Sequence, residues 1–229
     1  MKLTKFKKLV KKSGACTVVE IEDVGIWLTN GHAIYRATEL PHMDDILQVY
    51  AILDIAPNKK NSPIVNITNN GYELNYGYIN LQDYQEEDGE VEAEELMIQA
   101  AYKNNIFNVL FSKGGEMVFY NAEYLAPIID RVEEGYVRFF IRGKDERKYI
   151  AVKDGFQLIA AIMPVKFLSD EYLSELQDYQ LACMDQFRKE QEREKKKDEN
   201  QQTLDLQPVG HDQIEKEAQE AMQEADDQQ

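Results

Sequence analysis

The stretch YNAEYLAPIIDRVEEGYVRFFIRGKDERKYIAVKDGFQLIAAIMPVKF, residues 120–167, decides the fold. Its first part carries apolar residues at helical spacing and ends at Gly135: Tyr124, Leu125, Ile128, Ile129 and Val132. Runs rich in strand-forming residues follow at 136–141, 148–152 and 156–163, separated by glycine-containing turns. The segment therefore predicts a helix followed by three strands. Because Pro127 lies inside the helical stripe, that helix must start late or kink.

The N-terminal segment repeats this order of elements. A helix is predicted at 3–12 from an apolar face that Ser13-Gly14 ends: Leu3, Phe6, Leu9 and Val10. Three antiparallel strands are predicted at 17–21, 25–29 and 33–37, the last two joined by the hairpin turn Asn30-Gly31. Two explanations stay open, a structural duplication or two occurrences of a common helix-and-meander unit.

The region between these units is an extra segment at about 57–116. Strands are predicted at 48–55, just before it, and within it at 64–68, 72–81 and 106–111. An acidic loop at 85–90 leads into a predicted helix at 91–102. With the two units, this segment completes an α+β body over residues 1–167.

The composition changes after the body. A long charged helix is predicted at 168–198, capped by Ser169, with a three-four spacing of largely apolar residues: Leu173, Leu176, Gln180, Cys183 and Phe187. This stripe packs either on the body or on another subunit, and the body is the simpler expectation. Residues 199–229 are dominated by Glu, Gln and Asp, which predicts a disordered tail.

The charge balance is strongly acidic, with a formal net charge of −16 and a pI of about 4.7. This argues against a protein that coats nucleic acid with its whole surface, because phosphate attraction is electrostatic. The first twelve residues are the exception, since they hold six lysines and no acidic residue.

The cysteine count and hydropathy favour the cytoplasm. Cys16 and Cys183 lie far apart in sequence, so neither a disulfide framework nor a cysteine-rich zinc site is expected. The lysine-rich N-terminus lacks the apolar run of a signal peptide, and no stretch approaches the ~20 apolar residues that span a bilayer. No membrane association is expected.

The segment 120–167 resembles the closing unit of the bacterial DNA polymerase III β sliding clamp family. That family ends its last domain with a helix that opens on a tyrosine-leucine pair, three strands and a Met-Pro-Val-Arg-like terminal strand. The residues that carry the resemblance are Asn121-Ala122-Glu123-Tyr124-Leu125, Ile128-Ile129, Val137, Phe139, Gly143, Ile150, Asp154 and Ile162-Met163-Pro164-Val165-Lys166. The resemblance implies a sliding-clamp-like fold for the body.

The resemblance also implies two surfaces. In the family the helices line a ring and face DNA, so Lys5, Lys8 and Lys12, on one face of the first helix, are candidate DNA contacts. Solvated lysines with no DNA partner are the open alternative. The family's peptide-binding cleft lies beside the Met-Pro strand, which corresponds here to Met163, Pro164 and Val165.

The tail contains an apolar island, Gln201-Gln202-Thr203-Leu204-Asp205-Leu206. It resembles the hexapeptide with which polymerases and repair proteins bind bacterial sliding clamps. Gln201 would bond backbone groups at the cleft rim, and Leu204 and Leu206 would enter the cleft. An unstructured flank would add an ordering cost and keep the affinity modest.

No enzyme signature accompanies these features. His32, His42 and His211 lack metal-ligand spacing, and there is no phosphate-binding loop or nucleophile elbow, so no enzyme, metal or cofactor is expected. The leading hypothesis is an accessory protein of replication or recombination, of the kind phages encode, that tethers to a host sliding clamp. The alternatives are a genuine oligomeric clamp around duplex DNA, and an acidic inhibitor that mimics nucleic acid through residues 83–95.

Overall fold

The computed structural model describes residues 1–21, 24–57, 60–68, 79–84, 90–166 and 168–205. It divides into two compact units, Met1–Gln177, called the body below, and Asp178–Gln229. The described residues of the body combine α-helices with one sheet of ten strands. The predicted mixture of helix and strand is confirmed at this level.

The sheet is antiparallel between all its neighbouring strands except β1 and β4, which run parallel. Its order is β4 (Ile64–Thr68), β1 (Ala15–Ile21), β2 (Gly25–Thr29), β3 (Ala33–Arg36), β10 (Gln157–Ile162), β9 (Tyr149–Asp154), β8 (Val137–Arg142), β5 (Glu90–Tyr102), β6 (Asn105–Ser112) and β7 (Met117–Asn121).

Two similar halves meet in the middle of this sheet. Helix α1 (Leu3–Ser13) precedes β1, β2 and β3, while the 3₁₀ helix η2 (Ala122–Ile128) and helix α3 (Ile129–Glu133) precede β8, β9 and β10. The halves join where β3 pairs antiparallel with β10, with Ile34 opposite Ala161. The sheet order β1-β2-β3-β10-β9-β8 is therefore symmetric about that junction, and the predicted repeat of element order is present.

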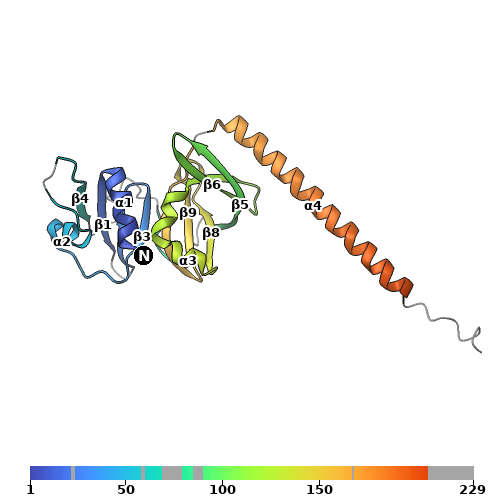
Figure 1. Ribbon diagram of the computed structural model, residues 1–229, viewed down its shortest axis with the longest axis horizontal. Helices are drawn as coiled ribbons and strands as arrows, with labels where there is room; N and C mark the ends of the chain where they lie inside the picture. The colour runs from blue at the N-terminus through green and yellow to red at the C-terminus, as the bar shows by residue number, and fades with distance from the viewer. Residues whose placement is uncertain (22–23, 58–59, 69–78, 85–89, 167, 206–229) are drawn as a thin grey trace, which may run out of the picture. The chain divides into compact units, whose positions relative to one another are not determined.

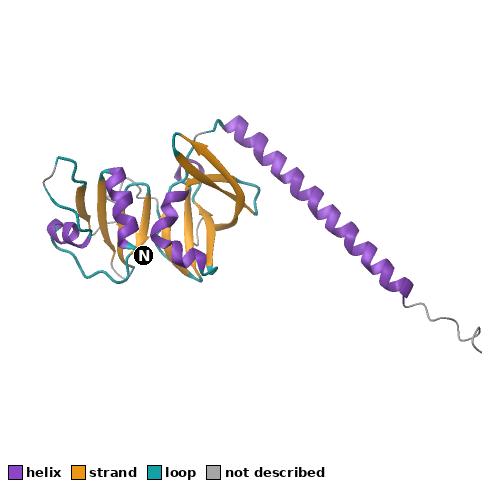
Figure 2. Cartoon of the chain, viewed as in Figure 1, coloured by secondary structure: helices purple, strands orange, loops and turns teal. Residues whose placement is uncertain are grey.

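Both helical segments cover the same face of the sheet (Figures 1 and 2). Phe6, Leu9 and Val10 of α1 are buried there in one cluster with Leu125 and Ile128 of η2. Several strands contribute alternate residues to this cluster, such as Cys16 and Val18 of β1 or Ile150 and Val152 of β9, because neighbouring side chains of a strand point to opposite faces. The apolar residues that recur every 3.6 positions in α1 and every second position in the strands therefore pack in one core.

The opposite face carries a second cluster built from the intervening strand residues. Trp27, Phe140, Tyr149 and Leu158 belong to it, and Leu81 packs against them from outside the sheet. Residues 79–84, called the strap below, lie on this face between β4 and β5 in sequence. The strap is therefore the described part of the extra segment that covers the second face.

Two predicted elements are wrong. The predicted strand at 48–55 is helix α2 (Ile46–Ile52), which Asp45 caps by accepting a hydrogen bond from the Leu47 backbone at 3.0 Å. The predicted helix at 91–102 is strand β5, which pairs with β6 on one side and with β8 on the other. Its glutamates favour a helix locally, and cross-strand pairing overrides that preference.

Most other predictions are confirmed. Strand β4 occupies 64–68 as predicted, and β6 contains the predicted strand at 106–111. Pro127 has the expected effect, because the segment around it is a 3₁₀ helix and the α-helix begins only at Ile129. Most of the strand predicted at 72–81 lies outside the described residues.

Helix α4 (Asp170–Asp205) starts as predicted, since the Ser169 hydroxyl accepts a hydrogen bond from the Tyr172 backbone at 3.3 Å. Leu173 and Leu176 pack against a small cluster on β6 and β7, so the first turns of the stripe pack on the body. In the second unit Tyr179, Met184 and Phe187 are exposed. The helix continues past the predicted end at 198 and includes residues 199–205.

Candidate functional site

The lysines of α1 lie beside an acidic second helix. Lys2 forms an ion pair with Asp130 of α3 at 2.6 Å, and Lys12 forms one with Glu123 of η2 at 2.7 Å. The Lys12 ammonium also donates to the Asn105 side chain at 3.0 Å. These contacts link opposite ends of α1 to opposite ends of η2 and α3, so the two helical segments run antiparallel.

The three candidate DNA contacts are therefore not equivalent. Lys5 and Lys8 are exposed, and neither side chain has an ion pair or hydrogen bond to another described residue. Lys12 is on the same face but is already engaged by Glu123. Two lysines of the set are available to phosphate groups, and the third is neutralised from the neighbouring helix.

A small apolar pocket of about 30 Å³ lies where the β2–β3 turn meets the end of β10. Met163 lines it, and the Met163 backbone donates a hydrogen bond to the His32 carbonyl at 2.9 Å. Pro164 and Val165, the other two predicted cleft residues, are not part of its wall, and the Val165 backbone donates to the Phe119 carbonyl at 2.8 Å. The remaining wall residues are Ile21, Thr29, Gly31, His32, Ala33, Ile34, Ile79, Leu81 and Ala161.

A second pocket, polar and of about 220 Å³, lies on the helix side between α1 and η2. Its wall includes Lys12, Glu123, Asn30 and His32, and His32 also borders the apolar pocket. The polar groups are engaged with one another, since Asn30 accepts from the His32 backbone at 3.2 Å and Lys12 is paired with Glu123. The His32 ring stacks on Tyr124 with centroids 6.1 Å apart.

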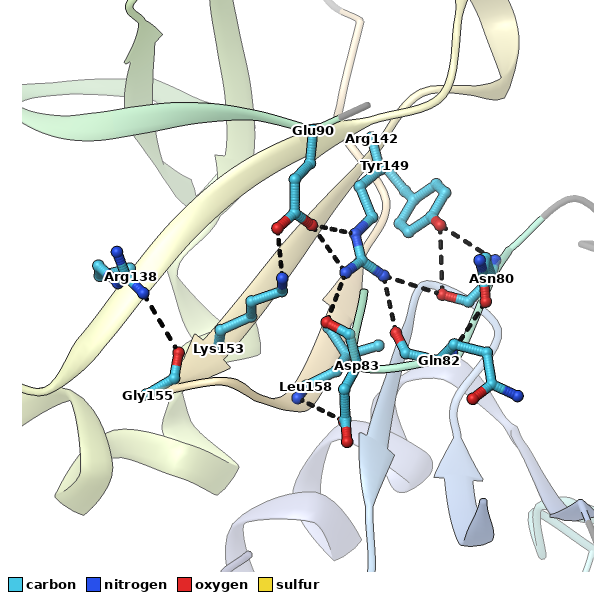
Figure 3. A network of polar contacts seen from close by, with 10 residues as sticks. All are labelled: Asn80, Gln82, Asp83, Glu90, Arg138, Arg142, Tyr149, Lys153, Gly155 and Leu158. Atoms are coloured by element: carbon cyan, nitrogen blue, oxygen red, sulfur yellow. Dashed lines mark hydrogen bonds and ion pairs between the residues drawn. The ribbon is translucent and has the colours of Figure 1, made fainter. Parts of the chain in front are cut away.

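Buried arginine Arg142 holds the strap on the second face (Figure 3). Its guanidinium donates hydrogen bonds to the carbonyls of Asn80 at 3.2 Å, Gln82 at 3.0 Å and Asp83 at 2.9 Å, and pairs with Glu90 at 2.7 Å. Glu90 also pairs with Lys153. A fully buried guanidinium is tolerated here because backbone carbonyls and one carboxylate accept its hydrogen bonds.

Two further groups fix the strap. The Tyr149 hydroxyl accepts from the Asn80 backbone at 3.0 Å, and burial raises the pKa of Tyr149. The Asp83 carboxylate accepts from the Leu158 backbone at 2.9 Å and from Arg36 at 2.8 Å. The Leu158 N–H reaches Asp83 at a point where the β9–β10 register is shifted.

These contacts also bear on the acidic stretch 83–95. Asp83 is paired with Arg36, Glu90 with Arg142 and Lys153, and Glu92 with Lys113. The Lys113 hydrogen bond is the main cause that lowers the pKa of Glu92. Residues 85–89 lie outside the described residues. The carboxylates paired in this way offer less free negative charge than the sequence indicates.

Other perturbed groups have structural causes. Burial raises the pKa of Cys16 to about 12 and raises the pKa of Tyr120, so both groups are protonated at neutral pH. Burial also raises the pKa of Glu95, whose carboxylate accepts a hydrogen bond from the Asn108 amide. These groups lie in or beside the core and are not arranged as a nucleophile with a base.

Within the described residues, no three His, Cys, Asp or Glu side chains are grouped so that they could hold a metal ion. None of the helices in that part of the chain is both long and apolar enough to cross a membrane.

The tail hexapeptide lies at the end of α4. Gln201 and Leu204 are on helical backbone, whereas the prediction was an unstructured flank. Their side chains, and Leu206 altogether, lie outside the described residues. The hexapeptide as a clamp-binding element stays a prediction from the sequence.

The strap residues were not identified from the sequence. Ile79 and Leu81 lie far from Met163 in the chain and show no motif, and Arg142 occurs in a strand where a charged side chain usually faces solvent. Comparisons of the chain with protein families, with curated proteins and with solved structures each returned no match.

Proposed function

We propose that this protein is a non-enzymatic accessory factor of DNA replication or recombination, with a body related to sliding clamps and a tail that tethers it to a sliding clamp. The observation that carries the proposal is the pair of helix-plus-three-strand halves joined at β3 and β10, with both helical segments on one face. The sequence resemblance at 120–167 falls on the second of these halves. The apolar pocket is lined by Met163, which belongs to the segment that resembles the strand beside the family's peptide-binding cleft.

An accessory role is favoured over a ring around DNA by the charge of the helix face. A clamp of the family presents basic helices to the duplex, whereas here Asp130 pairs with Lys2, just before α1, and Glu123 pairs with Lys12 of α1. Only Lys5 and Lys8 of the candidate set are left for phosphate contact. The described residues hold one pair of halves, whereas the family's rings are built from several such domains.

The second candidate function, a genuine oligomeric clamp, rests on the same pair of halves. It requires a symmetric oligomer that is retained on circular but not on linear duplex DNA.

The paired carboxylates of Asp83, Glu90 and Glu92 count against the third hypothesis, an acidic inhibitor that mimics nucleic acid.

The tether is tested with the full-length chain and a purified bacterial β clamp by isothermal titration calorimetry. We expect the double variant Leu204→Ala/Leu206→Ala to bind at least tenfold more weakly than the wild type, because both leucines enter the cleft in the proposed complex. Leu181→Ala is the matched control, since Leu181 is exposed on the same helix outside the hexapeptide. Equal binding by the wild type and the double variant would rule out the tether.

A further inference from the structure

The apolar pocket at Met163 is filled from within the chain. Ile79 and Leu81 of the strap are part of its wall, and Leu81 is only 5% exposed. The space that remains is about 30 Å³, a small fraction of the roughly 150 Å³ of an apolar protein cavity that accepts a benzene molecule. A leucine side chain of another peptide has no room there while the strap is in place.

The two strap residues have the spacing of a peptide ligand. Ile79 and Leu81 are separated by one residue, as are Leu204 and Leu206 in the tail. Both strap side chains reach the pocket together with Met163 and Ile34. An apolar side chain at every second position is also how an extended peptide fills a cleft.

We propose that the strap is a built-in occupant of this pocket, with Ile79 and Leu81 in the places of a bound peptide's two apolar side chains. The body is then closed to peptides from other chains, including the tail of a second copy. This inference rests on the proposed function, because it assigns the pocket as the counterpart of a clamp's peptide cleft. It makes the protein a donor of a clamp-binding peptide and not a receptor for one.

The hydrogen bonds of the strap explain why an external peptide does not displace it. Removal of the strap takes three carbonyl acceptors from the buried Arg142 guanidinium. A buried charge that loses its acceptors is strongly destabilising, so an incoming peptide binds only if its own contacts offset that loss. The strap is also covalently attached, so its effective concentration at the pocket is on the order of millimolar or higher.

The test uses a chain whose pocket is emptied, Ile79→Ala/Leu81→Ala. The substitutions remove the apolar contacts that hold residues 79–81 in the pocket. They leave the Gln82 and Asp83 carbonyls on Arg142, so a peptide has to displace only the first part of the strap. All proteins also carry Leu204→Ala/Leu206→Ala so that their own tails do not compete. The probe is a fluorescent synthetic peptide with the sequence of residues 199–208, and its binding is followed by fluorescence anisotropy.

We expect the emptied chain to bind this peptide at least tenfold more tightly than the chain with the intact strap. A peptide with both leucines replaced by alanine should not bind. Ile98→Ala, an exposed position on β5, is the control for loss of an isoleucine elsewhere. The single variant Ile79→Ala, expected to show a smaller gain, replaces the double variant if the latter does not fold.

Two results would overturn the inference. The first is that the chain with the intact strap binds the peptide as tightly as the emptied chain does. The second is that neither chain binds the peptide. Neither result affects the calorimetric test of the tether, in which the bacterial clamp is the receptor. If the bacterial clamp does not bind the tail but the emptied chain does bind the peptide, the proposed function is wrong. The strap is then still the occupant of a peptide pocket.

Discussion

At the scale of single residues, Gly143 is the glycine, among those that the structure describes, where an added Cβ would lie closest to the backbone. It has a φ of +81°, and a Cβ at this position would lie 2.4 Å from the Arg147 carbonyl oxygen. Relief of that contact requires the backbone between β8 and β9 to move. We therefore expect Gly143→Ala to lower the free energy of unfolding by roughly 3 kcal/mol, measured by chemical denaturation.

Gly155→Ala is the matched control for this prediction. Gly155 also has a positive φ, +60°, but a Cβ there meets no atom within 4 Å. Only the left-handed backbone conformation is penalised, at about 1–2 kcal/mol. Equal losses for the two variants would show that the β8–β9 turn absorbs the contact without cost.

Residue-scale prediction from the sequence reached only positions that belong to a local motif. Met163 was proposed as a cleft residue because it belongs to a contiguous run that resembles a known strand; it lines the apolar pocket, and its role in peptide binding stays a prediction. Ile79 and Leu81 could not be predicted, since their role depends on contacts with strands far away in the chain. Arg142 was missed because the burial of a charge depends on acceptors that only the fold brings together.

At the scale of elements, prediction followed the strength of the local pattern. Helix α1 and strand β4 were predicted nearly to the residue, because apolar periodicity and turn residues agree there. The run 46–52 is apolar and partly β-branched, and the cap at Asp45 decides for a helix. Strand β5 depends on two neighbouring strands, which no local pattern reveals.

The pairing of α1 with η2 leads to a prediction about DNA. Glu123→Gln removes the ion-pair partner of Lys12 and so adds a third free lysine to the face that holds Lys5 and Lys8. We expect the affinity for duplex DNA at low salt to rise several-fold. The slope of log affinity against log salt should also steepen by about 0.9, the value for one further phosphate contact. Fluorescence anisotropy with labelled duplex DNA measures both quantities.

Glu175→Gln is the control, because it changes the net charge equally at an exposed position of α4. A gain for Glu123→Gln that exceeds the gain for Glu175→Gln assigns the effect to the helix face. If the two variants behave alike, the lysines of α1 are ordinary solvated charges, the alternative left open by the sequence.

At the scale of the whole molecule, the central junction is the feature that sequence patterns do not contain. Each half can be predicted from its own turns and periodicity, but the pairing of β3 with β10 joins residues 127 positions apart in the case of Ile34 and Ala161. That junction also forms the apolar pocket, since wall residues come from both strands. Fold and candidate site therefore depend on the same long-range contact.

The strap adds a consequence for self-assembly. A chain with both an open cleft and a tail ligand would associate head to tail, and such heterologous contacts extend with concentration. If Ile79 and Leu81, which line the pocket, are its occupants as proposed, the wild-type mass in solution should be unchanged by Leu204→Ala/Leu206→Ala.

The emptied variant Ile79→Ala/Leu81→Ala should behave differently, because its pocket can accept the tail of another copy. We expect its average mass, measured by light scattering, to rise with concentration above that of the wild type. The same tail substitutions in that background should return the mass to the wild-type value, since they remove the ligand and leave the pocket open. If the average mass still rises with concentration after both tail leucines are replaced, the association involves another surface. The exposed residues of α4, Tyr179, Met184 and Phe187, are the candidate.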